Sequence, residues 1–170
     1  MRKFTLCLIG MLAASALGCV THEGPLAILM TSGPSASSSF SAKQINVEII
    51  VVELWDSGSQ TWVTVSGGSQ VHELLGLEGR VSPIALVNSI ERGNYTQVRV
   101  TFAEGNSSVV DANGRREPMR IEPTVITVQG LASVVEDATN NMTLELDLGV
   151  SLTERNSGLW TLRPVMRQIQ

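Results

Sequence analysis

The sequence predicts an all-β fold, an antiparallel β-sandwich of the immunoglobulin or transthyretin type, with little or no helix apart from an N-terminal signal peptide. Several segments alternate apolar and polar residues with the period of two that is typical of a strand with one buried face. Gly, Pro, Asn and Ser separate these segments at fairly regular intervals, and no segment keeps apolar residues at helical spacing for three turns. Many short antiparallel strands of this kind pack as a sandwich.

The strongest strand pattern lies in residues 44–55, which are rich in Ile, Val and Leu. Ile45, Val47 and Ile49 share one face of this strand, but the apolar residues from position 50 onward share the other face. Either both faces are buried along part of the strand, or a bulge near Ile49 and Ile50 shifts the register, and we expect the bulge. A turn at residues 56–60 then leads into a partner strand at residues 61–65.

The remaining elements are expected from the same patterns. Residues 108–119 predict a second hairpin, because Asn113 and Gly114 supply the positive φ that a tight turn needs. Pro164 makes the last strand an edge or bulged strand, since proline has no N–H to donate. Residues 71–77 are either a strand or a single helical turn, and residues 87–92 are a second candidate for a short helix. Further strands are predicted at residues 26–30, 82–87, 95–102, 124–128, 142–148 and 159–169.

Residues 1–18 have the layout of a secretory signal peptide. Arg2 and Lys3 precede an uncharged, mostly apolar run at residues 4–17, and small residues follow. As a helix this run rises only about 21 Å, which is less than the ~30 Å hydrocarbon core of a bilayer. We therefore expect export and cleavage, then a lipid anchor and short tether at residues 19–25 and a single β-sandwich domain at residues 26–170.

The signal peptide ends in Ala16-Leu17-Gly18-Cys19, which resembles the lipobox of bacterial lipoproteins. In that motif the cysteine is acylated, as with palmitate, and becomes the first mature residue. Ala16 and Leu17 stand in reversed order relative to the usual box, so ordinary cleavage after Ala16, which releases a soluble protein, stays open as an alternative. Cys7 lies in the removed segment, so the mature chain has a single thiol and forms no internal disulfide. We expect Cys19 to be the lipid attachment site.

Composition argues against several function classes. Removing Arg2 and Lys3 with the leader leaves ten basic and 16 acidic residues, a formal charge of −6. An acidic domain without a Lys/Arg cluster is a poor nucleic-acid binder. Two histidines and one acylated cysteine do not make a usual zinc site, and we expect neither a metal nor a cofactor. No Gly-x-Ser-x-Gly elbow accompanies His72, so we expect no enzyme.

The aromatic residues give the sharpest binding hypothesis. Trp55 and Trp62 flank the turn at residues 56–60, while Tyr95 and Trp160 lie on other predicted strands. Exposed rings on a sandwich stack on sugar faces, but aromatic residues at such positions also pack in the core or across strands. Both interpretations stay open, with Trp55 and Trp62 as the candidate binding residues.

The order of the segments resembles a family of bacterial lipoprotein domains catalogued as domain of unknown function 4382. The resemblance covers about residues 26–166 and implies a β-sandwich lipoprotein without assigning a chemistry. Ser32 stands where the family has an acidic residue, and Arg120-Ile121-Glu122-Pro123 lacks the family's Ser-Gly turn. The matching pieces are Thr31-Ser32-Gly33-Pro34, Trp62-Val63-Thr64-Val65, Leu74-Leu75-Gly76-Leu77, Gly93-x-Tyr95-x-Gln97-Val98-Arg99, Leu144-Glu145-Leu146-Asp147 and Leu162-Arg163-Pro164-Val165.

Together these observations predict a bacterial cell-envelope lipoprotein whose non-catalytic sandwich is an interaction or scaffold module. The alternative is a carbohydrate-binding or adhesion domain. The expected partners are the membrane, through the lipid on Cys19, and an envelope protein or glycan. We expect an extracytoplasmic, membrane-anchored protein, at the outer membrane or cell surface rather than the inner membrane, because Val20 and not Asp follows the cysteine.

Overall fold

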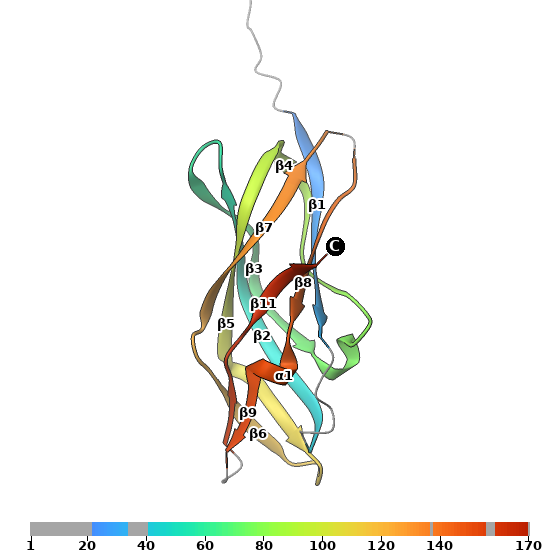
Figure 1. Cartoon of the computed structure of the whole chain (residues 1–170), viewed down its shortest axis with the longest axis vertical. Helices are drawn as coiled ribbons and strands as arrows, with labels where there is room; N and C mark the ends of the chain where they lie inside the picture. The colour runs from blue at the N-terminus through green and yellow to red at the C-terminus, as the bar shows by residue number, and fades with distance from the viewer. Residues whose placement is uncertain (1–21, 34–40, 137, 156–158, 170) are drawn as a thin grey trace, which may run out of the picture.

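The structure is a computed structural model, which describes residues 22–33, 41–136, 138–155 and 159–169. Its strands form two stacked layers, so the predicted all-β sandwich is confirmed (Figure 1). One sheet has four strands in the order β11-β8-β1-β4, and the other has seven strands, β3-β2-β5-β6-β10-β9 with β7 also paired to β5. The strands are β1 Glu23–Ser32, β2 Ala42–Asp56, β3 Thr61–Glu73, β4 Ser82–Glu91, β5 Gly93–Asp111, β6 Arg116–Ile121, β7 Val125–Val134, β8 Asn140–Leu146, β9 Leu152–Arg155, β10 Leu159–Leu162 and β11 Met166–Ile169.

Both sheets are mixed rather than purely antiparallel. β1 pairs with β8 in parallel, and β10 pairs with β6 in parallel, while the other strand pairs are antiparallel. The partners of each parallel pair are far apart in sequence, so they need no hairpin turn between them. The intervening strands supply the connection that a parallel pair requires.

The predicted bulge in β2 is confirmed. The register shifts between Ile49 and Val51 in the ladders to both β3 and β5. Ile45, Val47 and Ile49 are buried before the shift, and Val52 and Leu54 are buried after it. One extra residue thus keeps the apolar side chains of a 15-residue strand on the core face.

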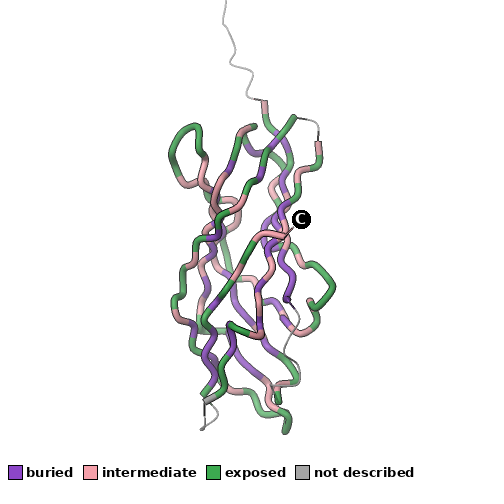
Figure 2. Tube along the Cα trace, viewed as in Figure 1, coloured by how far each residue is buried: buried purple, intermediate pink, exposed green. Residues whose placement is uncertain are grey.

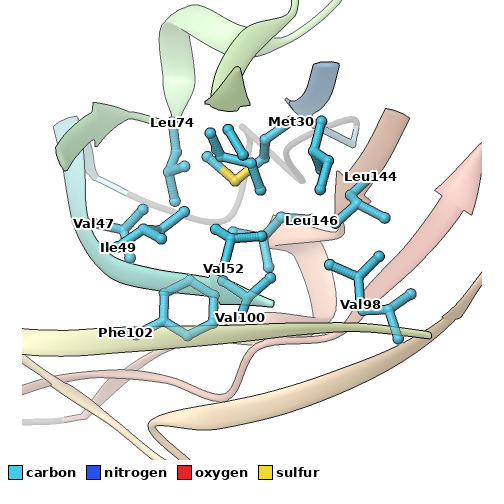
Figure 3. Close-up of a cluster of buried hydrophobic side chains, with 14 of the residues drawn as sticks. Met30, Val47, Ile49, Val52, Leu74, Val98, Val100, Phe102, Leu144 and Leu146 are labelled. Atoms are coloured by element: carbon cyan, nitrogen blue, oxygen red, sulfur yellow. The ribbon is translucent and has the colours of Figure 1, made fainter. Parts of the chain in front are cut away.

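The core lies between the two sheets. Met30 and Leu144 from the four-stranded sheet lie across from Val52, Val100 and Phe102 from the seven-stranded sheet (Figure 3). The inner positions are buried, while the turns and most outer positions are half-buried or exposed (Figure 2). Burial of apolar surface on both inner faces supplies the main favourable term in folding.

A side-chain amide links the two sheets along one side. Gln168 on β11 accepts a hydrogen bond from Leu131 N at 2.8 Å and donates one to Leu131 O at 3.1 Å on β7. The amide thereby replaces a strand partner at that point of β7. A β-carbon on the neighbouring Gly130 would lie 2.7 Å from Gln168 Oε1. The hydrogen bonds between Gln168 and Leu131 therefore favour glycine at position 130.

Several elements differ in detail from the predicted ones. β1 begins at Glu23 rather than at Leu26, and residues 87–91 belong to β4 instead of a helix. Residues 159–169 form two strands in different sheets. Pro164 lies between β10 and β11 and has no N–H to donate to a ladder. Residues 71–77 combine both expectations, since β3 ends at Glu73 and a 3₁₀ turn, η1, covers Leu75–Leu77. The one described α-helix, α1 at Leu148–Ser151, was not predicted.

The two ends of the sandwich carry different elements. β1 starts at the end that also carries the β2–β3 turn, whereas β6 and β9 lie at the opposite end (Figure 1). β5 runs nearly the whole length, and its 19 residues correspond to at most about 60 Å at ~3.3 Å per residue. Among the described residues no helix is long and apolar enough to cross a membrane.

Phe102→Ala is expected to lower the free energy of unfolding by about 3–5 kcal/mol, because it leaves a cavity between the sheets. Phe102 is 2% exposed. Leu86→Ala on β4 is the control: Leu86 is 68% exposed, so the change is expected to stay within about 0.5 kcal/mol. Urea unfolding of both variants measures the difference. Equal losses would contradict the assignment of Phe102 to the core.

Candidate functional site

The predicted aromatic pair lies on the outer face of the seven-stranded sheet. Trp55 on β2 pairs directly with Trp62 on β3. Their ring centroids are 5.4 Å apart, and the planes are inclined at 61°. Because the two rings share no plane, they do not present one flat platform to a ligand. This edge-to-face geometry is a known cross-strand packing contact.

An arginine covers one face of Trp62. The Arg99 guanidinium carbon lies 4.1 Å from the ring centroid, and Arg99 Nε donates to Glu53 Oε2 at 2.7 Å. The hydrogen bond from Arg99 lowers the pKa of the Glu53 carboxyl and raises the pKa of the guanidinium. The ion pair therefore holds the cation over the ring, where it occupies a surface that a sugar would need.

The other two aromatic candidates belong to the core. Trp160 and Tyr95 are each 2% exposed. The Tyr95 hydroxyl donates to Glu91 O at 2.8 Å, which satisfies the polar end of the buried ring. Neither residue contributes to an aromatic surface.

The sequence did not predict a polar network centred on Glu48, which is 6% exposed on the outer face of β2. The Glu48 carboxylate accepts from Ser69 Oγ on β3. It also accepts from Asn106 N at 3.0 Å and Asn106 Nδ2 at 2.9 Å on β5. These hydrogen bonds, the one from Ser69 first, lower the pKa of the Glu48 carboxyl. One carboxylate thus joins three strands without a cationic partner among these contacts.

Glu48 lies opposite a large bulge in β5 and is hydrogen-bonded to it. Glu48 pairs with Ala103, but Asn46, only two residues earlier, pairs with Ser108, so residues 104–107 project from the ladder. Glu48 N donates to Ser107 Oγ at 2.9 Å, and that hydroxyl donates to Ala103 O at 2.5 Å. Residues 103–107 lie between the predicted strands at residues 95–102 and 108–119 in the sequence. In the structure they form a bulge within one strand.

The structure does not complete a catalytic triad around His72. His72 Nδ1 lies 3.2 Å from Ser82 Oγ, and Nε2 is buried without a hydrogen-bond partner. In the described part of the chain, no carboxylate is hydrogen-bonded to either ring nitrogen, as an oriented base requires. Burial lowers the pKa of His72. The contact with Ser82 ties the start of β4 to β3.

The acidic turn at residues 111–114 is explained by turn chemistry. Asp111 Oδ1 accepts from Asn113 N at 2.9 Å and Arg115 N at 2.8 Å, and Gly114 has a φ of +83°. On β8, Glu145 is bound to Arg167 at 2.6 Å. Within the described ranges, no three His, Cys, Asp or Glu side chains are grouped to hold a metal ion.

Cys19 lies outside the described residues, and the first described residue, His22, is bonded to the sandwich. Arg92 N donates to His22 O at 3.0 Å, and His22 pairs with Glu136 at 2.6 Å. At the other end of β1, Ser32 is 4% exposed and donates to Leu74 O at 2.7 Å. A serine at this position therefore anchors β1 to the segment before η1.

Glu48→Gln is expected to lower the melting temperature on the order of 5 °C, because an amide NH₂ replaces an oxygen that accepts hydrogen bonds. Glu91→Gln is the control, since Glu91 is exposed on β4 and the charge change is the same. That control is expected to change the melting temperature by less than about 2 °C. Thermal unfolding of both variants distinguishes the network from a general charge effect, and a stable Glu48→Gln variant would contradict it.

The free energy of unfolding is expected to fall at acidic pH because His72 takes up a proton more readily in the unfolded chain. The folded-state pKa lies below the ordinary 6.5, so the unfolded chain binds more protons between the two values. The contribution of His72 is complete above about pH 6.5 and is lost as the pH falls toward the folded-state pKa. Urea unfolding between about pH 7.5 and 5.5 is expected to show a weaker decline in His72→Gln. A wild-type decline in His72→Gln would refute the assignment.

The comparisons with known proteins identify a family but no characterised relative. The family model described as a domain of unknown function, DUF4382, matches residues 23–164. This span runs from the first residue of β1 to Pro164, just before β11. No curated protein and no solved structure matches the chain. The protein therefore belongs to the DUF4382 family.

Proposed function

We propose that the protein is a cell-envelope lipoprotein, anchored through a lipid on Cys19, whose sandwich is a non-catalytic interaction or scaffold module. The observation that carries this proposal is the lipobox-like run Ala16-Leu17-Gly18-Cys19 at the end of a signal-like leader. A protein processed before Cys19 carries its only mature thiol at the first residue.

The start of the sandwich supports an anchor of short reach. His22 is already bonded to Arg92, and only three peptide steps separate it from Cys19. Three extended residues span at most about 11 Å. A lipid on Cys19 would hold the end with the β2–β3 turn near the membrane. The opposite end, with β6 and β9, would then point outward (Figure 1).

The absence of an assembled catalytic set in the described residues supports a binding role over an enzymatic one. Among the described residues, His72 has Ser82 beside it, and no carboxylate is hydrogen-bonded to its ring. The outer membrane or cell surface is the proposed location, because Val20 rather than Asp follows the cysteine. The partner is an envelope protein or a glycan.

A carbohydrate-binding role is the second candidate. The observation that favours it concerns a part of the surface away from Trp55 and Trp62. The bulge at residues 104–107 borders a polar hollow on the outer face of the seven-stranded sheet. Hydroxyl and amide groups in a hollow suit sugars better than the covered ring of Trp62 does.

Metabolic labelling with a palmitate analogue tests the anchor. The wild-type protein is expected to be labelled and to sediment with membranes, because Cys19 carries the lipid. Cys19→Ala is expected to lose both properties, whereas Cys7→Ala, the matched control in the leader, keeps them. Unlabelled, soluble wild-type protein beginning at Leu17 would instead establish cleavage after Ala16 and overturn the proposal.

A further inference from the structure

The irregular part of β5 borders a hollow that the Trp pair does not touch. It has a volume of about 270 Å³ and is lined by Gly105, Asn106, Ser107, Ser108, Arg116 and Pro118. A second hollow of about 340 Å³ shares Pro118 and includes Glu104, Arg120 and Leu159. Alternate residues of β6, at positions 116, 118 and 120, point to the outer face. The two hollows therefore follow each other along β6.

Ser108 supplies an unused hydroxyl to the first hollow. The residue is only 5% exposed, and its Oγ has no hydrogen-bond partner among the described residues. Val109 is in the core, so the side chain of Ser108 points to the outer face, where Pro118 lies opposite on β6. Buried hydroxyl groups are nearly always hydrogen-bonded, and an exception needs an explanation. A ligand in the hollow provides one.

Two further groups are available beside this hydroxyl. Arg116 is exposed and has no ion pair in the part of the chain that the structure describes, whereas its neighbour Arg115 is paired with Glu117. Asn106 Nδ2 donates to Glu48, which leaves Asn106 Oδ1 as a free acceptor in the described structure. Glu48 thus fixes the orientation of a side chain that lines the hollow.

The three groups define the chemistry of a ligand. A guanidinium pairs with a carboxylate, often through two parallel hydrogen bonds. The Ser108 hydroxyl and the Asn106 carbonyl suit neighbouring hydroxyl groups. The volume is slightly below the ~300–1,000 Å³ of pockets that enclose a drug-sized ligand, so it suits one residue of a larger molecule. A hexuronic acid carries a carboxylate next to hydroxyl groups.

We propose that this hollow, the Ser108 hollow, binds one uronic acid residue of an acidic polysaccharide. The second hollow adjoins the site along β6, but its Arg120 is ion-paired with Glu122, so Arg116 alone is assigned the contact with the carboxylate. A polysaccharide fits better than a peptide, since β5 and β6 are inside the sheet and have no free edge for strand addition. The inference names a ligand class for the proposed interaction module and rests on it.

Binding of the full-length chain in detergent micelles to short polygalacturonate oligomers tests the site. Calorimetric titration is expected to show at least tenfold weaker binding for Arg116→Gln and for Ser108→Ala. Arg115→Gln is the matched control, since it removes an adjacent exposed guanidinium and the same charge. It is expected to stay within twofold of wild type. Equal loss in Arg115→Gln and Arg116→Gln would indicate general charge attraction and overturn the proposal.

Two other probes separate the ligand classes. Methyl-esterified oligomers have the same sugar without the carboxylate charge and are expected to bind at least tenfold more weakly. Poly-glutamate of matched charge is expected to bind as weakly as the ester. Tighter binding of poly-glutamate than of polygalacturonate would replace the polysaccharide with an acidic peptide, and no uronate binding at all would refute the site.

The melting temperature of each variant shows whether weaker binding is caused by misfolding. Ser108→Ala removes an unpaired buried hydroxyl, so its melting temperature is expected to rise while its binding weakens. A fall in both would assign Ser108 a structural role and contradict the proposal. Palmitate labelling of Cys19 is independent of this titration, so loss of the anchor and loss of the glycan site are distinguishable outcomes.

Discussion

The outer face of the protein depends on one buried carboxylate. Glu48 accepts hydrogen bonds from Ser69 and from the backbone and side chain of Asn106, and its own N–H donates to Ser107. A bulge removes backbone groups from the ladder, and those groups need other partners when they are buried. Glu48 supplies such a partner from the neighbouring strand. The position of the bulge, the orientation of Asn106 and the hollow over Ser108 all follow from that network.

The same strand divides the outer face into two regions. Trp55 at the end of β2 packs edge-to-face on Trp62, and Arg99 covers that ring while bound to Glu53. This region consists of contacts within the protein and lies toward the end where β1 begins (Figure 1). In the region around Glu48, the Ser108 hydroxyl has no hydrogen-bond partner among the described residues. We therefore propose the polar region for ligand binding, whereas the aromatic region is occupied by packing contacts.

Local patterns in the sequence predict the features that depend on neighbours in the chain. The apolar residues change from one strand face to the other at Ile49 and Ile50, which predicts the bulge in β2. Asn113-Gly114 predicts the turn between β5 and β6. The parallel pairing of β1 with β8 has no local pattern, since it joins strands more than 100 residues apart. Residues 103–107 lie between two predicted strands, and the hydrogen bonds to Glu48 make them part of one strand. The candidate site was missed for this reason: its groups come from segments that only the folded sheet brings together.

The most direct test of the account is to map the ligand on the folded protein. Backbone amide shifts are to be recorded by NMR during titration with a galacturonate oligomer. The largest shifts are expected at residues 105–108, 116, 117, 119 and 120, with little change at Trp55 and Trp62. The largest shifts at the Trp pair, or small shifts spread evenly over the surface, would contradict it.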